Sequence, residues 1–257
     1  YSFLLSPVQF FSVALAPQYS PGNIVYKTHQ YLKPFLKAGI TTKEIDDLAD
    51  KYIRSLDAIP SCKNYQGYPA AICISVNDEV VHGIASSRKL ENGDIVTLDI
   101  CACYKGYHGD SAWSYQIGEI DDEKTHLMRY TEEALYVGLE QVKPGNRIGD
   151  IGNAVYNFAT EHNLGVVREL CGHGIGQNLH EDPDVPNYGA ANTGVRLRKG
   201  MTIAVEPMLT AGSPDIEILD DDWTVVTEDG HPAAHFEHTV VVTEDGYEIL
   251  TGEWLDG

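Results

Sequence analysis

One segment of this 257-residue chain recurs later in similar form, and the repeat limits the folds that the chain can adopt. Residues 90–99 and residues 197–206 share a leucine, a glycine, alternating aliphatic residues and a final acid at matching positions. A strand that ends in a carboxylate, made twice, suits a pseudo-twofold fold with a site between its halves. Chance similarity between two amphipathic strands is the alternative, because strand patterns are common.

Helical and strand-like patterns follow one another in mixed order. A capping box at residues 41–44 precedes apolar residues at helical spacing over residues 45–56. Two more helices are predicted over residues 121–142 and 148–162, separated by the breaker sequence Lys-Pro-Gly-Asn. Strands are expected over residues 72–76, 95–103, 112–117, 201–205, 224–227 and 239–243. This mixture indicates an α+β or α/β protein.

Composition limits which partners, domain organisation and cell compartment we expect. With 18 Lys and Arg against 38 Asp and Glu, the formal net charge of −20 would repel a phosphate backbone, so we expect no direct nucleic-acid binding. The length and the 43% hydrophobic content favour a single domain with a large core. Five scattered cysteines suit a reducing compartment better than a disulfide framework, so we expect a cytoplasmic protein.

The first 26 residues carry no charged side chain and include an apolar stretch at residues 10–17. The tripeptide Ala-Leu-Ala at residues 14–16 resembles a signal-peptidase site. Against export, no Met or basic region precedes the stretch, and Pro7 and Gln9 interrupt it. The stretch is also too short to span a membrane, so we expect no membrane association.

Two acids, Asp99 and Asp110, flank a segment with Tyr-Lys-Gly near its midpoint at residues 104–106. A hairpin that turns there would place the acids roughly opposite each other, and directly opposed Cβ atoms lie about 5 Å apart. Two like charges so close are destabilising unless one is protonated or a cation lies between them. Taken alone, such a pair is more often two solvated surface acids.

Further polar residues follow in contexts that suit a ligand. His173 lies among glycines, where the backbone can approach a ligand closely, and His180 follows shortly after. Glu206 ends one aliphatic strand and Glu237 precedes another, although burying a carboxylate is costly without a partner. Each feature alone is weak, since a lone histidine is more often a packing or surface residue than a ligand.

Together, and in this order, these residues resemble the methionine aminopeptidases of the pita-bread metallopeptidase fold. The resemblance covers about residues 39–250 and includes the words Leu-Asp-Ile, His-Gly-Asp-Ser, Gly-His-Gly-Ile-Gly, Val-Glu-Pro-Met and Phe-Glu-His-Thr. The short spacing from Glu206 to Glu237 is similar to that of the type I enzymes. The resemblance implies an α+β pita-bread (creatinase/aminopeptidase) fold, a pseudo-twofold antiparallel sheet covered by helices. We accordingly expect a single catalytic domain with two pseudo-symmetric halves over residues 39–257, after an N-terminal segment of uncertain structure over residues 1–38.

The resemblance also implies a metal-dependent hydrolase that removes the initiator methionine from nascent polypeptides, with two divalent ions per chain. The implied ligands are Asp99 for one ion, His173 and Glu206 for the other, and Asp110 and Glu237 as bridges between them. Glu206 would also handle the proton of the attacking water, while His82 and His180 would contact the scissile amide. Co, Mn, Fe, Ni and Zn would all suit such a donor set.

By the same resemblance, a pocket of sulfur and aromatic surfaces would hold the methionine side chain, because such surfaces suit a thioether. The residues expected to bind substrate are Cys62, Tyr65, Tyr68, Cys73, His82, Leu179, His180 and Trp223. Leu179 stands where family members commonly carry Phe, which would leave the pocket roomier. Ala204 replaces a usual threonine near the glutamate ligand, which removes a possible hydrogen bond.

Two alternatives stay open. Prolidases and aminopeptidase P share the ligand set, so X-Pro cleavage is a second enzymatic hypothesis, although Glu206-Pro207-Met208 favours methionine removal. A non-catalytic pita-bread binding module is a third hypothesis, disfavoured because every implied ligand is present. The expected partner is the N-terminal methionine of nascent polypeptides, met at the ribosome, and the expected state is a monomer.

Overall fold

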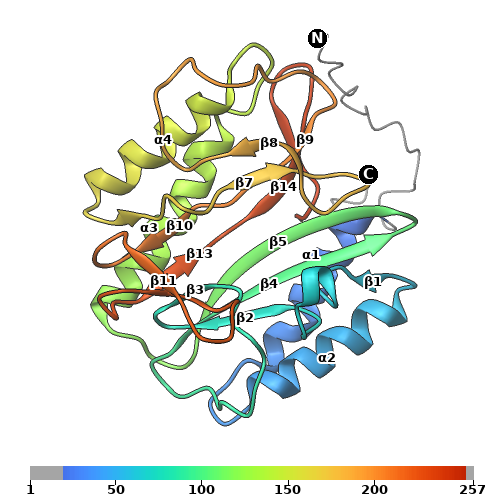
Figure 1. The fold of residues 1–257 in the computed structure, drawn as a ribbon, viewed down its shortest axis with the longest axis vertical. Helices are drawn as coiled ribbons and strands as arrows, with labels where there is room; N and C mark the ends of the chain where they lie inside the picture. Colours follow the sequence, from blue (N-terminus) through green and yellow to red (C-terminus); the bar gives the residue numbers. More distant parts are fainter. Residues whose placement is uncertain (1–19, 253–257) are drawn as a thin grey trace.

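The structure, a computed structural model, describes residues 20–252, in which helices pack beside antiparallel strands (Figure 1). The helices are α1 (Pro21–Leu32), α2 (Thr42–Ser55), α3 (Asp122–Leu139) and α4 (Ile148–Glu161), with 3-10 turns η2 (Lys33–Phe35) and η3 (Tyr65–Gly67). Within residues 20–252, no helix is long and apolar enough to cross a lipid bilayer.

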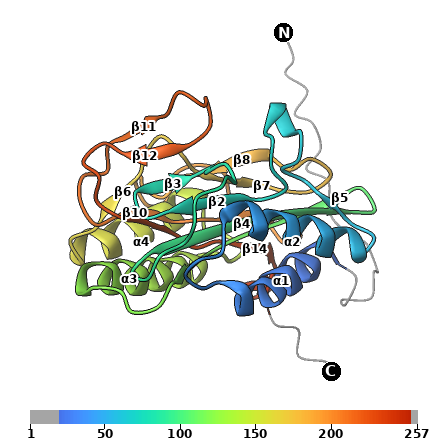
Figure 2. The same cartoon turned by 90° about the horizontal axis from the view of Figure 1, so that it is seen from below.

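The strands form four small sheets, and every strand pair among the described residues is antiparallel. One sheet contains β1 (Ile59–Pro60), β2 (Cys73–Val76), β4 (Ile95–Tyr104) and β5 (Tyr107–Gln116). A second contains β7 (Gly172–Gly174), β8 (Glu181–Val185), β9 (Thr202–Val205), β14 (His238–Val242) and β15 (Tyr247–Ile249). The two smaller sheets are β6 (Gly165–Val166) with β10 (Met208–Thr210) and β13 (Ala233–His235), and β3 (Glu79–Val81) with β11 (Ile216–Ile218) and β12 (Val225–Thr227). Seen along the sheets, α1 to α4 lie on one side of the strands, and β11 and β12 lie on the other (Figure 2).

Helices and strands bury their apolar sides in two main cores. One core joins α1 and α2 to β2 and β4, and the other joins α3 and α4 to β9 and β14. The predicted capping box at the start of α2 is confirmed: Thr41 Oγ1 accepts from the N–H of Glu44 (3.1 Å), and Glu44 Oε2 accepts from the N–H of Thr41 (2.8 Å). Each predicted helix and strand corresponds to an observed element, with ends that differ by a few residues.

The hairpin of β4 and β5 corrects one detail of the sequence prediction. Its turn is Lys105-Gly106, so Asp110 lies opposite Cys101, and Asp99 lies opposite Ala112. Asp99 and Asp110 are therefore diagonal neighbours on one face of the hairpin, not an opposed pair. The turn is tighter than expected because both of its residues adopt left-handed backbone, with φ of 51° and 82°.

Both copies of the repeated segment have the same local structure. Gly93 and Gly200 have φ of 95° and 88°, which favours glycine. Their N–H groups donate to the carbonyls of Ile117 and Val242, each 2.8 Å away near the end of the neighbouring strand. Each copy then enters β4 or β9. This equivalence supports the pseudo-symmetric halves, which stay a prediction for the chain as a whole.

Hydrogen bonds between β5 and β14 join the two strand pairs. Thr239 Oγ1 donates to the carbonyl of Asp110 (2.8 Å) and accepts from its N–H (3.1 Å). Ser111 Oγ donates to the carbonyl of Glu237 (2.7 Å), whose N–H donates to the carbonyl of Ala112 (2.8 Å). These residues are buried and the polar atoms named are paired with one another, so no water is needed to satisfy them.

Helix α1 lies within residues 1–38, where the sequence predicts no element. The helix packs so closely on β5 that a Cβ on Gly109 would lie 2.7 Å from the nitrogen of Gly22. It shares a core with α2, so it packs against the domain expected to begin at residue 39. That boundary stays a prediction, and the apolar stretch at residues 10–17 with its signal-like tripeptide lies outside the described residues.

A buried aspartate in α2 fixes the segment that leads into β2. Asp46 is 2% exposed, and its Oδ1 accepts hydrogen bonds from the N–H groups of Ala71 (2.7 Å) and Ile72 (3.2 Å). The segment lies between Tyr68 and Cys73, so these bonds help to position both residues.

We expect Asp46→Ala to lower the free energy of unfolding by about 1–3 kcal/mol, because two buried N–H groups lose their acceptor. Asp46→Asn should lose less, since its amide oxygen can still accept. Denaturant-induced unfolding measures both changes. The matched control is Asp47→Ala, whose carboxylate is 53% exposed and should change stability by less than about 0.5 kcal/mol. Equal losses in Asp46→Ala and the control would contradict this role.

Candidate active site

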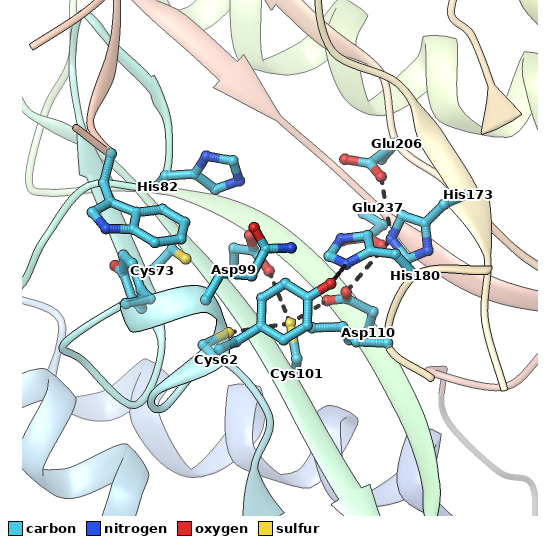
Figure 3. Close-up of a pocket in the computed structure, with 15 residues that line it drawn as sticks. Cys62, Cys73, His82, Asp99, Cys101, Asp110, His173, His180, Glu206 and Glu237 are labelled. Atoms are coloured by element: carbon cyan, nitrogen blue, oxygen red, sulfur yellow. Dashed lines mark hydrogen bonds and ion pairs between the residues drawn. The ribbon is translucent and has the colours of Figure 1, made fainter. Parts of the chain in front are cut away.

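The structure brings every site residue predicted from the sequence to one cavity of about 320 Å³. The lining consists of Cys62, Tyr65, Gln66, Tyr68, Cys73, His82, Asp99, Cys101, Asp110, His173, Leu179, His180, Glu206, Trp223 and Glu237. Its two ends differ in chemistry: Cys73 and His82 lie toward one end, and Asp110, His173 and Glu237 lie toward the other (Figure 3).

Two antiparallel strand pairs supply the four acids. Asp99 and Asp110 project from the same face of the β4–β5 hairpin. Glu206 directly follows β9 and Glu237 directly precedes β14, where Val205 pairs with His238. Glu206 and Glu237 therefore lie side by side, one residue beyond the last pair of the β9–β14 ladder. The hydrogen bonds between β5 and β14 hold this end of the ladder beside the two aspartates.

The acids are poorly compensated by the protein itself. Burial, and next the charge of Asp99, raise the pKa values of Asp110 and Glu206 well above the ordinary range. Burial, and next the charge of Asp110, do the same to the pKa of Glu237, and burial raises the pKa of Asp99. Glu237 Oε1 has no hydrogen-bond partner among residues 20–252. Protons or cations must therefore neutralise this cluster.

The imidazole of His173 is presented with one nitrogen free. Its Nδ1 lies 2.8 Å from the carbonyl of Gly174, which can only accept, so Nδ1 carries the proton. The unprotonated Nε2 then points toward Asp110 Oδ2 (3.8 Å) and Glu206 Oε1 (3.7 Å). Burial lowers the pKa of His173 to about 4, so the ring is neutral at pH 7 and can bind a metal. A Cβ on the preceding residue, Gly172, would lie 2.3 Å from the carbonyl oxygen of Ala204, which explains the glycine there.

Two other histidines line the cavity as neutral rings. His82 follows β3 with φ of 59°, in the left-handed region that few residues other than glycine adopt. Burial, and next the charge of His235, lower its pKa to about 4. His180 Nδ1 lies 2.8 Å from the hydroxyl of Tyr65, and burial is the main cause of its lowered pKa.

The other end of the cavity is soft and aromatic. The rings of Tyr68 and Trp223 meet edge to face with centroids 5.1 Å apart, and the Tyr68 hydroxyl donates to the carbonyl of Gly83 (2.8 Å). Cys62, Cys73 and Leu179 are each at most 6% exposed and pack in the same cluster. This surface can contact an apolar side chain.

Three residues at the cavity or in contact with its acids are absent from the sequence prediction. Cys101 and Gln66 line the cavity, and His235, which is 1% exposed, is buried beside Glu206. His235 Nε2 approaches Glu206 Oε2 to 3.3 Å, at an angle that makes no hydrogen bond. Two of them could have been found from the sequence, because residues two apart in a strand point to the same face. Cys101 is two residues from Asp99, and His235 is two residues from Glu237.

The donor atoms fit divalent metal ions. Three groups have one donor atom from each member within 4.8 Å of the others: Asp99, Cys101 and Asp110; Asp110, His173 and Glu237; Glu206, His235 and Glu237. Asp110 and Glu237 each belong to two of these groups. Carboxylate and imidazole donors suit first-row divalent ions.

Comparison with known proteins identifies the family. The pattern of "Metallopeptidase family M24" matches residues 21–244. The chain belongs to metallopeptidase family M24. Within this family it groups with the methionine aminopeptidases: it is 52% identical to "Methionine aminopeptidase 1" of Bacillus subtilis over 230 residues, which cover 90% of this chain and 93% of the relative.

Solved structures of M24 relatives agree in fold. A methionine aminopeptidase from Rickettsia prowazekii superposes with a TM-score of 0.90 at 40% identity, covering 91% of this chain and 95% of that one. A methionine aminopeptidase from Thermotoga maritima gives a TM-score of 0.89 at 42% identity, covering 91% and 94%. The predicted pita-bread fold of this M24 peptidase is therefore confirmed.

We expect Glu237→Gln to stabilise the metal-free M24 peptidase. The pKa of Glu237 is higher in the folded protein than in the unfolded chain, where the carboxyl loses its proton above about pH 4.3. The folded protein therefore becomes less stable relative to the unfolded chain as pH rises above that value. At pH 8 the variant's thermal midpoint should exceed that of the wild type by at least about 2 °C, the shift for roughly 1 kcal/mol in a chain of this size.

Thermal unfolding of chelated protein between pH 4 and pH 8 measures this difference, which should shrink toward pH 4. The control is Glu228→Gln, which replaces an exposed acid, and its thermal midpoint should differ from that of the wild type by the same small amount at every pH. A lower midpoint for Glu237→Gln at pH 8 would contradict the electrostatic account.

Proposed function

We propose that this chain hydrolyses the peptide bond after an N-terminal methionine, at a centre of two divalent ions. One observation carries the proposal: a buried cluster of four acids and a neutral imidazole lines the same cavity as a soft, aromatic pocket. The acids suit cations, and the pocket suits an apolar side chain. The names of the relatives fit the same activity.

The proposed ligands keep the roles expected from the family resemblance. Asp99 would hold one ion, His173 and Glu206 the other, and Asp110 and Glu237 would contact both. The membership of Asp110 and Glu237 in two donor groups supports their bridging role. When bound, such ions supply Lewis-acid chemistry: they lower the pKa of water and stabilise negative charge on a carbonyl oxygen.

The chain's own residues would then handle protons and the scissile amide. Glu206 is the proposed general base, because its carboxylate lies among the metal donors in the cavity, where it can take a proton from water and return it to the leaving amine. His82 and His180 are neutral and can each donate an N–H to the substrate amide or its tetrahedral intermediate. Both line the cavity with Glu206.

The soft end of the cavity is the proposed methionine pocket. Tyr68 and Trp223 offer ring surfaces, and Cys62 and Cys73 offer sulfur, all of which suit a thioether. Leu179 packs in the same cluster, where an aliphatic side chain occupies less width than an aromatic ring would.

We also propose a cytoplasmic monomer that meets nascent chains at the ribosome. All five cysteines are free thiols, which fits a reducing compartment. The net charge of −20 disfavours direct contact with ribosomal RNA, so the polypeptide itself is the proposed partner.

We expect Met-Ala-Ser to be hydrolysed only when a divalent ion is returned to chelated protein, and faster than Ala-Pro. Asp110→Ala should abolish turnover while circular dichroism stays native, because one bridging carboxylate is lost. Peptide hydrolysis followed by chromatography measures both. Full activity after exhaustive chelation would contradict the proposal, faster cleavage of Ala-Pro would indicate an X-Pro peptidase, and failure to bind any ion would indicate a binding module.

We expect Tyr65→Phe to lower kcat by roughly 10–100-fold, because His180 Nδ1 loses the hydroxyl that orients its ring. The pH profile of kcat should shift as well, since the hydroxyl contacts a titrating nitrogen. Steady-state kinetics with Met-Ala-Ser test this. Tyr188→Phe, 39% exposed, is the control, and unchanged kcat and pH profile in Tyr65→Phe would sink the idea.

A further inference from the structure

Cys101 lies where the β-hairpin directs side chains to the acids. It is two residues after Asp99 in β4 and directly opposite Asp110 in β5, so all three side chains share one face. Its Sγ lies 2.9 Å from Asp110 Oδ1 and 3.7 Å from Asp99 Oδ1. Figure 3 shows the Cys101 sulfur between Cys62 and Asp110. The sulfur and one oxygen from each acid lie within 4.8 Å of one another, as three ligands of one ion would.

The two oxygens of Asp110 face different groups. Oδ1 is next to the sulfur of Cys101, whereas Oδ2 lies 3.8 Å from Nε2 of His173. If Asp110 contacted one ion through each oxygen, the two ions would have different neighbouring donor atoms. The ion near His173 would receive nitrogen and oxygen, and the ion near Asp99 would have sulfur within reach.

We propose that the thiolate of Cys101 is an additional ligand of the ion held by Asp99 and Asp110. This inference rests on the dinuclear centre of the proposed function and adds a residue to it. Coordination breaks the S–H bond, releases the proton to solvent and forms a sulfur–metal bond, with no change in oxidation state.

In the metal-free protein the hydrogen bond from Cys62 lowers the pKa of the Cys101 thiol, but burial and the charges of Asp110 and Asp99 raise it well above the usual range, so a cation must displace the proton. Two features of the surroundings favour coordination once a cation is present. Cys101 is 4% exposed, so water competes little for the ion there. Cys62 Sγ lies 3.3 Å away as a hydrogen-bond donor to Cys101 Sγ, and a donor at that position stabilises a coordinated thiolate. Cys101 makes no other side-chain hydrogen bond to residues 20–252 than those to Cys62, Asp99 and Asp110.

A sulfur ligand changes which ions the position prefers. Thiolates favour softer ions such as Zn²⁺ and Co²⁺ over Mn²⁺, which prefers oxygen. The position near Asp99 should therefore discriminate between these ions more strongly than the position near His173.

The test is anaerobic titration of chelated, phosphine-reduced protein with Co²⁺, followed by absorption spectroscopy. Visible d–d bands report any bound cobalt, and a near-ultraviolet charge-transfer band reports a sulfur ligand. The wild type should show both, and Cys101→Ser and Cys101→Ala should keep the d–d bands but lose the charge-transfer band. Cys103→Ser, two residues further along β4, is the matched control and should keep both.

Each outcome decides one claim. If the d–d bands are absent in the wild type, the proposed dinuclear centre fails. If they are present without a charge-transfer band, or if that band survives in both Cys101 variants, the centre stands and the Cys101 inference is wrong. Loss of the band in Cys62→Ser but not in Cys101→Ser would assign the sulfur to Cys62 and would equally overturn the inference.

Calorimetric titration gives a second readout that is independent of spectra and activity. Cys101→Ser should weaken Zn²⁺ binding by at least about 10-fold and Mn²⁺ binding by less than about 3-fold, because serine replaces the soft donor with a hard one. Equal losses for the two ions would indicate a general structural effect and contradict the inference.

Discussion

The fold gathers carboxylates that repel one another, and this repulsion governs the chemistry of the site. Asp99, Asp110, Glu206 and Glu237 approach each other because backbone hydrogen bonds fix the strands that carry them. Burial removes the water that would screen their charges, and their raised pKa values record the cost. Cations can compensate that cost, so the same geometry that destabilises the metal-free protein suits the binding of metal ions.

Two strand pairs, β4 with β5 and β9 with β14, position two acids each. The first strand of each pair follows a buried leucine and a left-handed glycine of the repeated segment. The buried bonds of Thr239 and Ser111 across β5 and β14 set the distance between the pairs. Since these bonds involve backbone atoms of Asp110 and Glu237 themselves, a small shift at the junction would move both proposed bridging ligands.

Much of the site could be predicted from the sequence because the residues that offer metal donor atoms lie in short, specific sequence motifs. Local patterns also predicted the capped helix α2 and six of the strands, namely β2, β4, β5, β9, β12 and β14, whereas most of the strands that were missed have only two or three residues. The contacts that depend on register could not be predicted: whether Asp110 faces Asp99 or Cys101 depends on a turn of two residues at Lys105 and Gly106. For the same reason His235 was missed, since its approach to Glu206 joins different strands. Helix α1 was missed because its first half belongs to the uncharged residues 1–26, whose sequence resembles a leader more than the start of an amphipathic helix.

We infer that two cations lie among these acids. Anomalous diffraction from crystals grown with Mn²⁺ tests it most directly, because it locates each ion relative to each carboxylate. We expect two peaks, one beside Asp99 and one beside His173, with Asp110 and Glu237 in contact with both. Peaks elsewhere, or acids in this cavity with no metal at saturating Mn²⁺, would contradict it.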